Sequence, residues 1–432
     1  MTATWTNWAG DQHARPQTIE RPSSVAELSQ IIVRAVNTDR VIRVVGAGHS
    51  FGDLVCTDGV LISLDNLSGL LHYDPSSGLA TVAGGTRLYE LNQLLDSHGR
   101  ALANLGDINV QSVAGAISTA THGTGVKLGN LATQVAALEI VTADGSVRTI
   151  SGGEELQAAR VSIGALGVIS AVTLRTVPSF RLHNIDKRCP MDETLSRLDE
   201  LVTCNDHFEF WVFPHADDAL CRANNRTPAL PVPRSRLGSH AQEFMENRVL
   251  DLVCRVGRRF PRRIPALNRF ATAAMLGGER IDTSHRIFSS VRDVRFTESE
   301  WAMPREAAQS AVREIKAASE KFDVNFPLEV RFVAADEDSF LSPAWGRETC
   351  YVAAHTYTGM EWGRFLQTVQ DIALAHAGRP HWGKRHTLEA SALAQLYPMW
   401  DGFQNIRAAL DPGGRFANGH IRRVLGPVEA RR

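Results

Sequence analysis

A glycine-rich stretch directly after a predicted strand is the feature that most restricts the fold of this chain. Residues 43–51 read RVVGAGHSF, so an apolar run ends in the triplet 46–48 and His49 follows at once. A dinucleotide-binding βαβ unit needs a third glycine and then a helix. Phe51 occupies the position of that third glycine, and a turn at 57–59 leads to another strand. The triplet therefore predicts a nest of backbone N–H groups that binds an anion, in a fold other than the dinucleotide-binding βαβ fold.

The size and charge of the chain limit the classes of function. At 432 residues it exceeds one ordinary core, so we expect two domains, 1–178 and 179–432, with about 380–432 packing back on the first. The net charge of −1 argues against a nucleic-acid partner. No apolar run reaches the length of a membrane span, and the first residues lack the pattern of a signal peptide. Six scattered cysteines without a C-x-x-C pair indicate reduced thiols, so we expect a cytoplasmic protein.

Apolar spacing predicts a mixed α and β fold. A capping box at Ser24 and Glu27 opens a helix, and residues 88–99 form a second amphipathic helix that ends in glycine. Short apolar runs between turns predict strands, with a hairpin at 135–150 around an Asp-Gly turn. Beyond residue 178, aromatic residues become frequent and strands alternate with helices such as 303–322. The fold class is therefore α+β, with an antiparallel sheet covered by helices in the second half.

A second stretch of small residues, 112–125, reads SVAGAISTATHGTG. Such a stretch has too little apolar surface to build a core by itself. We expect it to lie against a large planar ligand and to offer backbone N–H groups and hydroxyls. The alternative is a tight, glycine-rich contact between a helix and a sheet.

A basic run, RVGRRFPRR at 255–263, is the most highly charged segment of the second half. A run of this kind is usually a solvated surface. Docking of a partner is the alternative interpretation.

These two small-residue stretches, together with EVRF at 329–332 and HWGK at 381–384, resemble the vanillyl-alcohol-oxidase-type FAD family. Within it they are similar to the aldonolactone oxidoreductase branch, and to its actinobacterial L-gulono-1,4-lactone dehydrogenases in particular. The likeness covers nearly the whole chain, and four motifs in the same order make it specific. It implies a two-domain FAD-binding fold (the PCMH type) with an antiparallel-sheet cap domain.

The resemblance implies that FAD is the cofactor and that His49 is bonded covalently to the 8α carbon of the flavin. A neutral imidazole nitrogen is a competent nucleophile for such a bond. The alternative is that His49 only packs on the ring. The cofactor contacts that the resemblance implies are Gly46, Ala47, Gly48, His49, Ser50, Phe51, Gly106, Asp107, Ser112, Gly115, Ser118, Thr119, His122, Gly123, Val168 and His381.

Glu329 and Arg331 are the main candidates for catalysis. They are two residues apart on a predicted strand, so their side chains lie on the same face. Their neighbours on the strand are apolar, which favours an enclosed pair over a surface ion pair at a sheet edge. The resemblance implies that Glu329 binds substrate hydroxyls and that Arg331 lies near the reacting oxygen and the flavin.

Three further residues complete the expected site. The resemblance places Lys384, of the HWGK motif, near the flavin and the substrate, and it makes Asn104 the substrate-contacting polar residue before the second stretch. His355 lies on a predicted strand and is a candidate to assist removal of the hydroxyl proton, although a histidine in a strand is more often structural. We expect no metal, because His381 and His386 lack a third ligand at suitable spacing.

The resemblance implies oxidation of a sugar lactone, L-gulono-1,4-lactone, at the C2 hydroxyl, with hydride transfer to flavin N5. The 2-keto lactone then enolises to L-ascorbate. In the family that the chain resembles, a small residue at this place controls the access of oxygen to the flavin. With Ala103 as that residue, the resemblance implies a cytochrome, a quinone or a dye as electron acceptor in preference to oxygen. An oxidase of alditols, or of D-arabinono-1,4-lactone, is the alternative within the class. A non-catalytic flavin-binding redox module is the alternative outside it.

Overall fold

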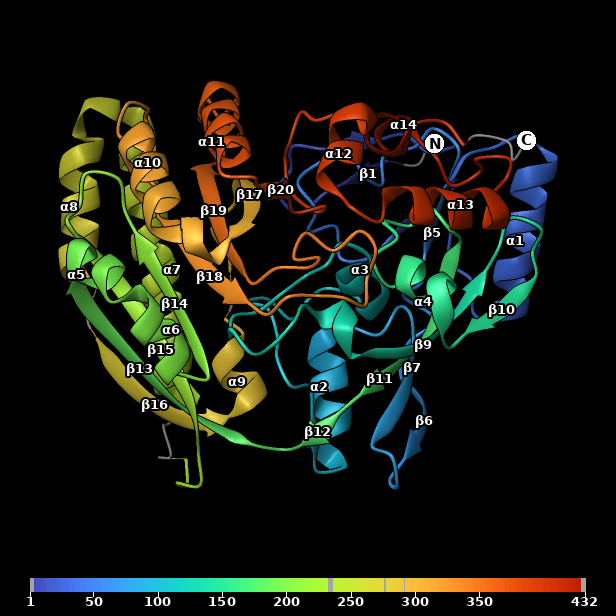
Figure 1. Ribbon diagram of the computed structural model, residues 1–432, viewed down its shortest axis with the longest axis horizontal. Helices are drawn as coiled ribbons and strands as arrows, with labels where there is room; N and C mark the ends of the chain where they lie inside the picture. Colours follow the sequence, from blue (N-terminus) through green and yellow to red (C-terminus); the bar gives the residue numbers. More distant parts are fainter. Residues whose placement is uncertain (1–3, 232–235, 276, 291, 429–432) are drawn as a thin grey trace.

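Two groups of sheets make up the fold, and they lie side by side in Figure 1. The computed structural model describes residues 4–231, 236–275, 277–290 and 292–428. The large sheet and its helices occupy the left of Figure 1, and the sheets of the N-terminal half occupy the right. This arrangement is the predicted mixture of helices and antiparallel sheets. The domain division at residue 178 stays a prediction.

The N-terminal half contains a three-stranded parallel sheet, β3-β5-β4, and a five-stranded antiparallel sheet, β10-β9-β11-β7-β6. The predicted hairpin at 135–150 is present as β9 and β10. The strands are β3 Thr18–Glu20, β4 Ile42–Val45, β5 Val60–Ser63, β6 Leu70–Asp74, β7 Leu79–Ala83, β9 Val135–Val141, β10 Val147–Ile150 and β11 Val168–Arg175.

Helices cover these sheets: α1 Val25–Asn37, α2 Leu88–Ser97, α3 Val113–Ser118 and α4 Gly153–Arg160. The predicted cap of α1 is confirmed, because Ser24 Oγ accepts a hydrogen bond from the Glu27 N–H. The apolar stripe of α1, which includes Ile31 and Ile32, packs on residues of β4 and β5. Apolar spacing thus decides which face of the helix is buried.

The second half is built on an eight-stranded antiparallel sheet with the order β16-β13-β15-β14-β18-β19-β17-β20. Every residue of β19 is buried, so this strand lies in the interior of the fold. The strands are β13 Arg181–Pro190, β14 His207–Val212, β15 Asp218–Thr227, β16 Gly278–Thr283, β17 Phe296–Pro304, β18 Leu328–Val333, β19 Thr349–Tyr357 and β20 Arg379–Pro380.

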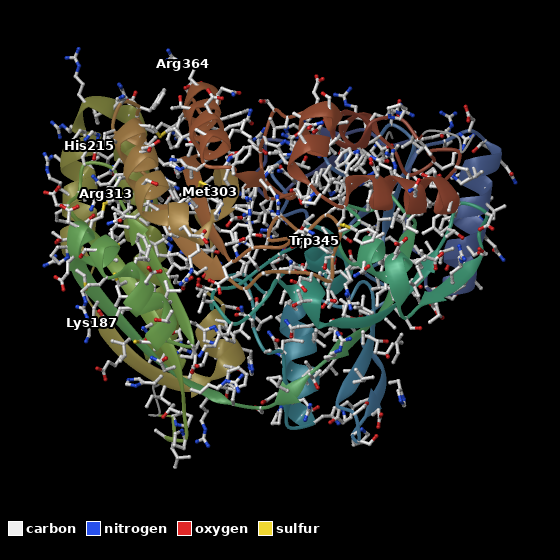
Figure 2. The ribbon with its side chains drawn as sticks, in the orientation of Figure 1. Lys187, His215, Met303, Arg313, Trp345 and Arg364 are labelled. Carbon is white, nitrogen blue, oxygen red and sulfur yellow. The ribbon has the colours of Figure 1, made fainter. Side chains whose placement is uncertain are left out.

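The helices of the second half lie on the outside of this sheet and above the N-terminal half (Figure 1). Figure 2 shows Met303 of β17 among packed side chains, whereas Arg364 of α11 extends outward. The helices are α5 Met191–Ser196, α6 Leu198–Cys204, α7 Arg236–Arg259, α8 Ile264–Ala274, α9 Ser284–Phe288, α10 Ala308–Ser319, α11 Gly363–Ala375, α12 Ala390–Leu396, α13 Trp400–Leu410 and α14 Gly419–Leu425. Among the described residues, no helix has the length and apolar character needed to cross a bilayer.

A buried arginine fastens the C-terminal segment to the N-terminal half. Arg43 of β4 is only 2% exposed, and its guanidinium donates hydrogen bonds to four backbone carbonyls. These belong to Leu54, Ile163, Gly164 and Phe416, which lie in three separate segments of the chain. Burial lowers the pKa of Arg43 to about 10, so it still carries its charge at neutral pH.

We expect Arg43→Met to lower the free energy of unfolding by about 3 kcal/mol, because four buried carbonyls lose their donor together. Urea denaturation followed by circular dichroism measures this change. Arg40→Met is the matched control, since Arg40 is exposed, and it should change stability by less than about 0.5 kcal/mol. Equal midpoints for the two variants would contradict the role given to Arg43.

Candidate active site

Two cavities meet between the sheets and share part of their walls. The first is lined by the triplet 46–48 and by the start of α3, and the second by residues of the large sheet. His49 and Gln111 line both cavities, as do Ser50 and Thr119. Both stretches of small residues therefore lie where the two cavities join.

Close packing explains the small residues of the first cavity. A side chain at Gly46 would overlap the Ser112 hydroxyl, and Gly48 has a φ of +71°, which favours glycine. The first half of the stretch 112–125 is helix α3, capped by Ser112 Oγ. The Gly-rich helix–sheet contact is thus present, since Gly84 next to β7 lies against Ala114 of α3. Gly115 and Ser118 of the same helix line the first cavity.

His49 lies at the junction with a neutral side chain. Its ring stacks on Trp8, with 4.9 Å between the ring centroids. Burial lowers the pKa of His49 to about 4, and the nearby charges of Lys384 and Arg87 act in the same direction. The imidazole therefore keeps a free nitrogen lone pair at neutral pH.

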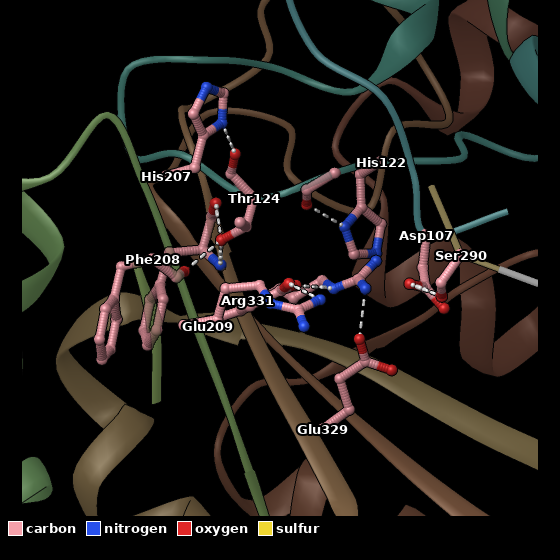
Figure 3. A network of polar contacts seen from close by, with 12 residues as sticks. Asp107, His122, Thr124, His207, Phe208, Glu209, Ser290, Glu329 and Arg331 are labelled. Atoms are coloured by element: carbon pink, nitrogen blue, oxygen red, sulfur yellow. Dashed lines mark hydrogen bonds and ion pairs between the residues drawn. The ribbon is translucent and has the colours of Figure 1, made fainter. Parts of the chain in front are cut away.

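Arg331 and Glu329 project into the second cavity from β18, as their spacing predicted. Arg331 lies between two carboxylates (Figure 3): its Nε is 2.7 Å from Glu209 Oε2, and its other side pairs with Glu329. Burial alone would lower the pKa of Arg331, but the two carboxylates outweigh it and raise the pKa. Burial raises the pKa of Glu209, and Arg331 opposes that shift. The guanidinium is therefore a permanent cation held on both sides.

Asp107 lies beside this group and binds protein side chains. Its Oδ2 is 2.6 Å from Arg292 Nε, and its Oδ1 accepts a hydrogen bond of 2.9 Å from Ser290 (Figure 3). Burial would raise the pKa of Asp107, but Arg292 and Arg331 outweigh it and lower the pKa to about 2. The carboxylate thus stays ionised and fixes the wall of the cavity near Gly106, which also lines it.

Lys384 is a second cation in the same cavity, and its side chain is half-buried. Its Nζ is 2.5 Å from Glu298 Oε2 and 3.8 Å from Glu300 Oε2. Burial would lower the pKa of Lys384, but these carboxylates outweigh it and raise the pKa. Glu298 also faces His355, with 3.6 Å between Oε1 and the ring Nε2. Lys384 and His355 are thus connected through one carboxylate.

His122, Glu300 and His381 form a buried group whose ligand-type atoms lie within 4.8 Å of one another. His122 Nε2 is 3.1 Å from Glu300 Oε1. His381 Nδ1 accepts a hydrogen bond from the Gly383 N–H, so in the neutral ring the proton is on Nε2 and that atom is no metal ligand. Burial lowers the pKa of His381 to about 3, which keeps the ring neutral. The group therefore favours hydrogen bonding over metal binding.

Three predicted residues are not among those that line the cavities: Asn104, Gly123 and Val168. Asn104 Nδ2 donates to the Thr124 carbonyl, and a side chain at Gly123 would overlap Asn104. Val168 is fully buried in the core beside α1. Asn104 and Gly123 support the cavity wall, because the Asn104 side chain satisfies a buried backbone carbonyl that would otherwise lack a partner. Thr124 continues this contact, since its hydroxyl donates to the Phe208 carbonyl of β14 (Figure 3).

Three carboxylates of the site were not predicted: Glu209, Glu298 and Glu300. Their signal is visible in the sequence, because HFEFW at 207–211 and TESEW at 297–301 place acidic residues at alternate positions of otherwise buried strands. An acidic residue in such a strand needs a cation nearby. The cation, however, lies far away in the sequence: Arg331 of β18 pairs with Glu209, and Lys384, in the segment after β20, pairs with Glu298. The sequence alone does not state these pairings.

Comparison with known proteins agrees with this geometry. The profile of the D-arabinono-1,4-lactone oxidase family matches residues 172–424, and that of an FAD binding domain matches residues 16–151. L-gulono-1,4-lactone dehydrogenase of Mycobacterium tuberculosis is 47% identical over 99% of this chain and 100% of its own. Mouse L-gulonolactone oxidase is 35% identical over 97% of both chains. The crystal structure of a cholesterol oxidase from Brevibacterium sterolicum has the same fold, with a TM-score of 0.83 and 16% identity over 99% of this chain and 97% of its own.

We expect Arg331→Met to lower the free energy of unfolding by about 3 kcal/mol at neutral pH, because Glu209 loses its nearest cation and keeps only Arg222, at 3.9 Å. Adding Glu209→Gln should restore part of this loss, so the double variant should be more stable than Arg331→Met alone. Burial raises the pKa of Glu209, and without Arg331 less charge opposes this shift, so the carboxylate gains a proton on folding and the loss should shrink as the pH falls.

Urea denaturation of Arg331→Met, of Glu209→Gln and of the double variant at two pH values measures these effects. Arg188→Met is the control, because Arg188 is exposed and pairs with Asp218 at the surface. Strict additivity of the two substitutions, with the same loss at both pH values, would show that Arg331 and Glu209 do not act as a pair.

Proposed function

Because this chain belongs to the aldonolactone oxidoreductase branch of the vanillyl-alcohol-oxidase-type FAD family, we propose that it oxidises L-gulono-1,4-lactone at the C2 hydroxyl. The product would be the 2-keto lactone, which enolises to L-ascorbate. The observation that carries the proposal is the group of Glu329, Arg331 and Lys384 on one cavity wall, next to His49. A cavity with fixed cations and carboxylates suits a small substrate rich in hydroxyls.

The residues present fit FAD. The first cavity has the backbone N–H groups of 46–48 for a pyrophosphate, and small residues that let a long ligand approach closely. At the junction, Gln111 Oε1 is buried without a hydrogen-bond partner, which suits a ligand that donates there. FAD, when bound, supplies the acceptor for the hydride that leaves the substrate carbon. The residues that we propose to hold it include Gly46, Ala47, Gly48, His49, Ser50, Gln111, Ser112, Gly115, Ser118, Thr119 and His381.

We propose that His49 carries the flavin covalently. Its ring is neutral, lies where the two cavities join, and is held in place by Trp8. These are the conditions for a histidine to act as a nucleophile without losing a proton first.

His355 is the residue that we assign to the hydroxyl proton. Its Nδ1 is 3.0 Å from the Pro327 carbonyl, so that nitrogen carries the proton of the neutral ring and Nε2 has the free lone pair. Glu298 lies 3.6 Å from Nε2 and stabilises the ring once it is charged. Glu329 would accept hydrogen bonds from the other hydroxyls of the lactone. Arg331 and Lys384 would stabilise negative charge on the reacting oxygen.

For the electron acceptor we propose a cytochrome, a quinone or a dye, with oxygen a poor substitute. The support is the 47% identity to a protein described as a dehydrogenase. Ala103 adds no support, because it is not among the residues lining either cavity. The six cysteines are free thiols, which is consistent with the cytoplasmic location that we propose.

We expect Glu329→Gln and Lys384→Met to lower kcat/KM for L-gulono-1,4-lactone by about a hundredfold or more, because each removes a charge that faces the reacting groups. Dye reduction measures the rates, with other lactones and alditols as further substrates. Lys187→Met is the control, since Lys187 is exposed on β13 of the large sheet (Figure 2). Folded, yellow variants with full lactone activity would refute the assignment, and turnover of alditols alone would replace the substrate.

We expect acid precipitation to leave the yellow colour in the pellet of the unaltered protein and to release it from His49→Ala. Because the pKa of His49 is about 4, attachment of added FAD to the apoprotein should proceed equally well from roughly pH 5 to pH 8. His13→Ala is the control, since His13 is exposed and is not among the residues that line either cavity. Free flavin in the supernatant of the unaltered protein would rule out the bond while leaving FAD binding intact.

A further inference from the structure

The basic run predicted from the sequence lies on a helical hairpin at the outer edge of the large sheet (Figure 1). The hairpin is α7, a short turn at Pro261–Arg263, and α8. Between residues 248 and 275 the sequence has seven arginines and a single acidic residue, Asp251. The whole chain has a net charge of −1, so this segment is a strong local excess of positive charge.

Four arginines of the hairpin lack the carboxylate partners that the cations of the cavity have. Among the residues that the structure describes, no carboxylate lies within ion-pair distance of Arg259, Arg262, Arg263 or Arg269. Asp251 pairs with Arg255, so it does not neutralise them. The four side chains are exposed. Their charge therefore faces solvent without compensation.

Apolar side chains are exposed on the same hairpin. Leu252 is 62% exposed, Phe260 50% and Phe270 60%. Of the large hydrophobic side chains exposed in the described part of the chain, half lie between residues 230 and 270. A concentration of this kind marks an interaction surface, whereas single exposed residues do not.

The charged and apolar side chains form one continuous surface. Leu252 and Arg259 are seven residues apart on α7, which places them on one face of that helix. Arg263 and Phe270 have the same spacing at the start of α8. The guanidinium groups of Arg259 and Arg263 lie 5.2 and 5.6 Å from the centre of the Phe260 ring, so this ring joins the two faces.

The inner side of the hairpin is fixed, so the outer surface is rigid. Asn325 Nδ2 donates to the Cys254 carbonyl, and Asn268 Nδ2 donates to the carbonyls of Pro214 and Val324. Leu250, on the side of α7 opposite Leu252, lines the second cavity. A partner on the outer surface would therefore lie within about one helix diameter, 10–12 Å, of the cavity wall.

We propose that the outer surface of α7 and α8 docks on an anionic phospholipid bilayer. Leu252, Phe260 and Phe270 enter the boundary between headgroups and acyl chains, and the unpaired arginines contact the lipid phosphates. A bilayer satisfies both kinds of side chain at once, because arginine extends its guanidinium to the phosphates while apolar neighbours lie deeper. A nucleic acid would contact the arginines, but it would offer no apolar partner to Leu252 and Phe270. This inference does not depend on the lactone chemistry.

Sedimentation of the FAD-loaded full chain with lipid vesicles tests the proposal. We expect binding to phosphatidylcholine vesicles that contain phosphatidylglycerol, none to pure phosphatidylcholine, and release by salt. The variant R259E/R262E/R263E should bind more weakly by roughly a hundredfold or more, since each arginine near an anionic surface contributes about fivefold and each glutamate adds repulsion. F260S/F270S should weaken binding about tenfold through loss of apolar burial.

The matched control is R21E/R40E/R364E, which alters the net charge equally at exposed arginines elsewhere. It should keep most of the vesicle binding, and all three variants should keep the dye-reducing activity of the unaltered protein. Equal loss in the control, equal binding to neutral vesicles, or no vesicle binding would overturn the proposal. Binding to duplex DNA or to an acidic protein in place of vesicles would also overturn it.

Discussion

The arrangement of the second cavity depends on the pairing of buried charge, above all on Arg331 between Glu209 and Glu329. These three groups come from neighbouring strands, because Glu209 of β14 is opposite Arg331 of β18 in the register of the sheet. A guanidinium removed from water needs carboxylates at hydrogen-bond distance, and a slip of one residue would turn every one of these side chains to the other face. The ion pairs and the strand register are thus the same constraint.

The first cavity depends on a different constraint, the close approach of backbone segments. Gly46 and Gly48 have no side chain where Ser112 and the N-terminal residues pack against them. Arg43, just before them, holds the C-terminal segment through the Phe416 carbonyl. His49 follows these residues directly, so its position at the junction is determined by a rigid strand end on one side and by Trp8 on the other. A rigid position of this kind is what a covalent or stacking contact with a ring requires.

Local sequence patterns predicted much of this structure. They did not predict which distant segments of the chain pair with one another. The cap at Ser24, the hairpin at 135–150 and the shared face of Glu329 and Arg331 follow from periodicity and turn chemistry alone. Helix α3 was not predicted, because its six residues are too few to show a helical repeat of apolar positions. Glu298 and Glu300 were not predicted as site residues, since the pairing of β17 with β19 brings Glu298 to His355, and the pairing of β17 with β20 brings Lys384 to both carboxylates.

The number of buried charges in the second cavity also separates an enzyme from a module that only binds a flavin. Replacing a buried ion pair with apolar residues of similar volume is often neutral or stabilising. A chain under selection for flavin binding alone would therefore gain nothing from Glu298 and Lys384, which lie in the cavity away from the triplet 46–48. Groups that cost stability are retained where a substrate is bound and its charge changes during the reaction. Burial, charge and position therefore lead to the same conclusion as the family relationship, that the second cavity is built for chemistry on a small polar substrate.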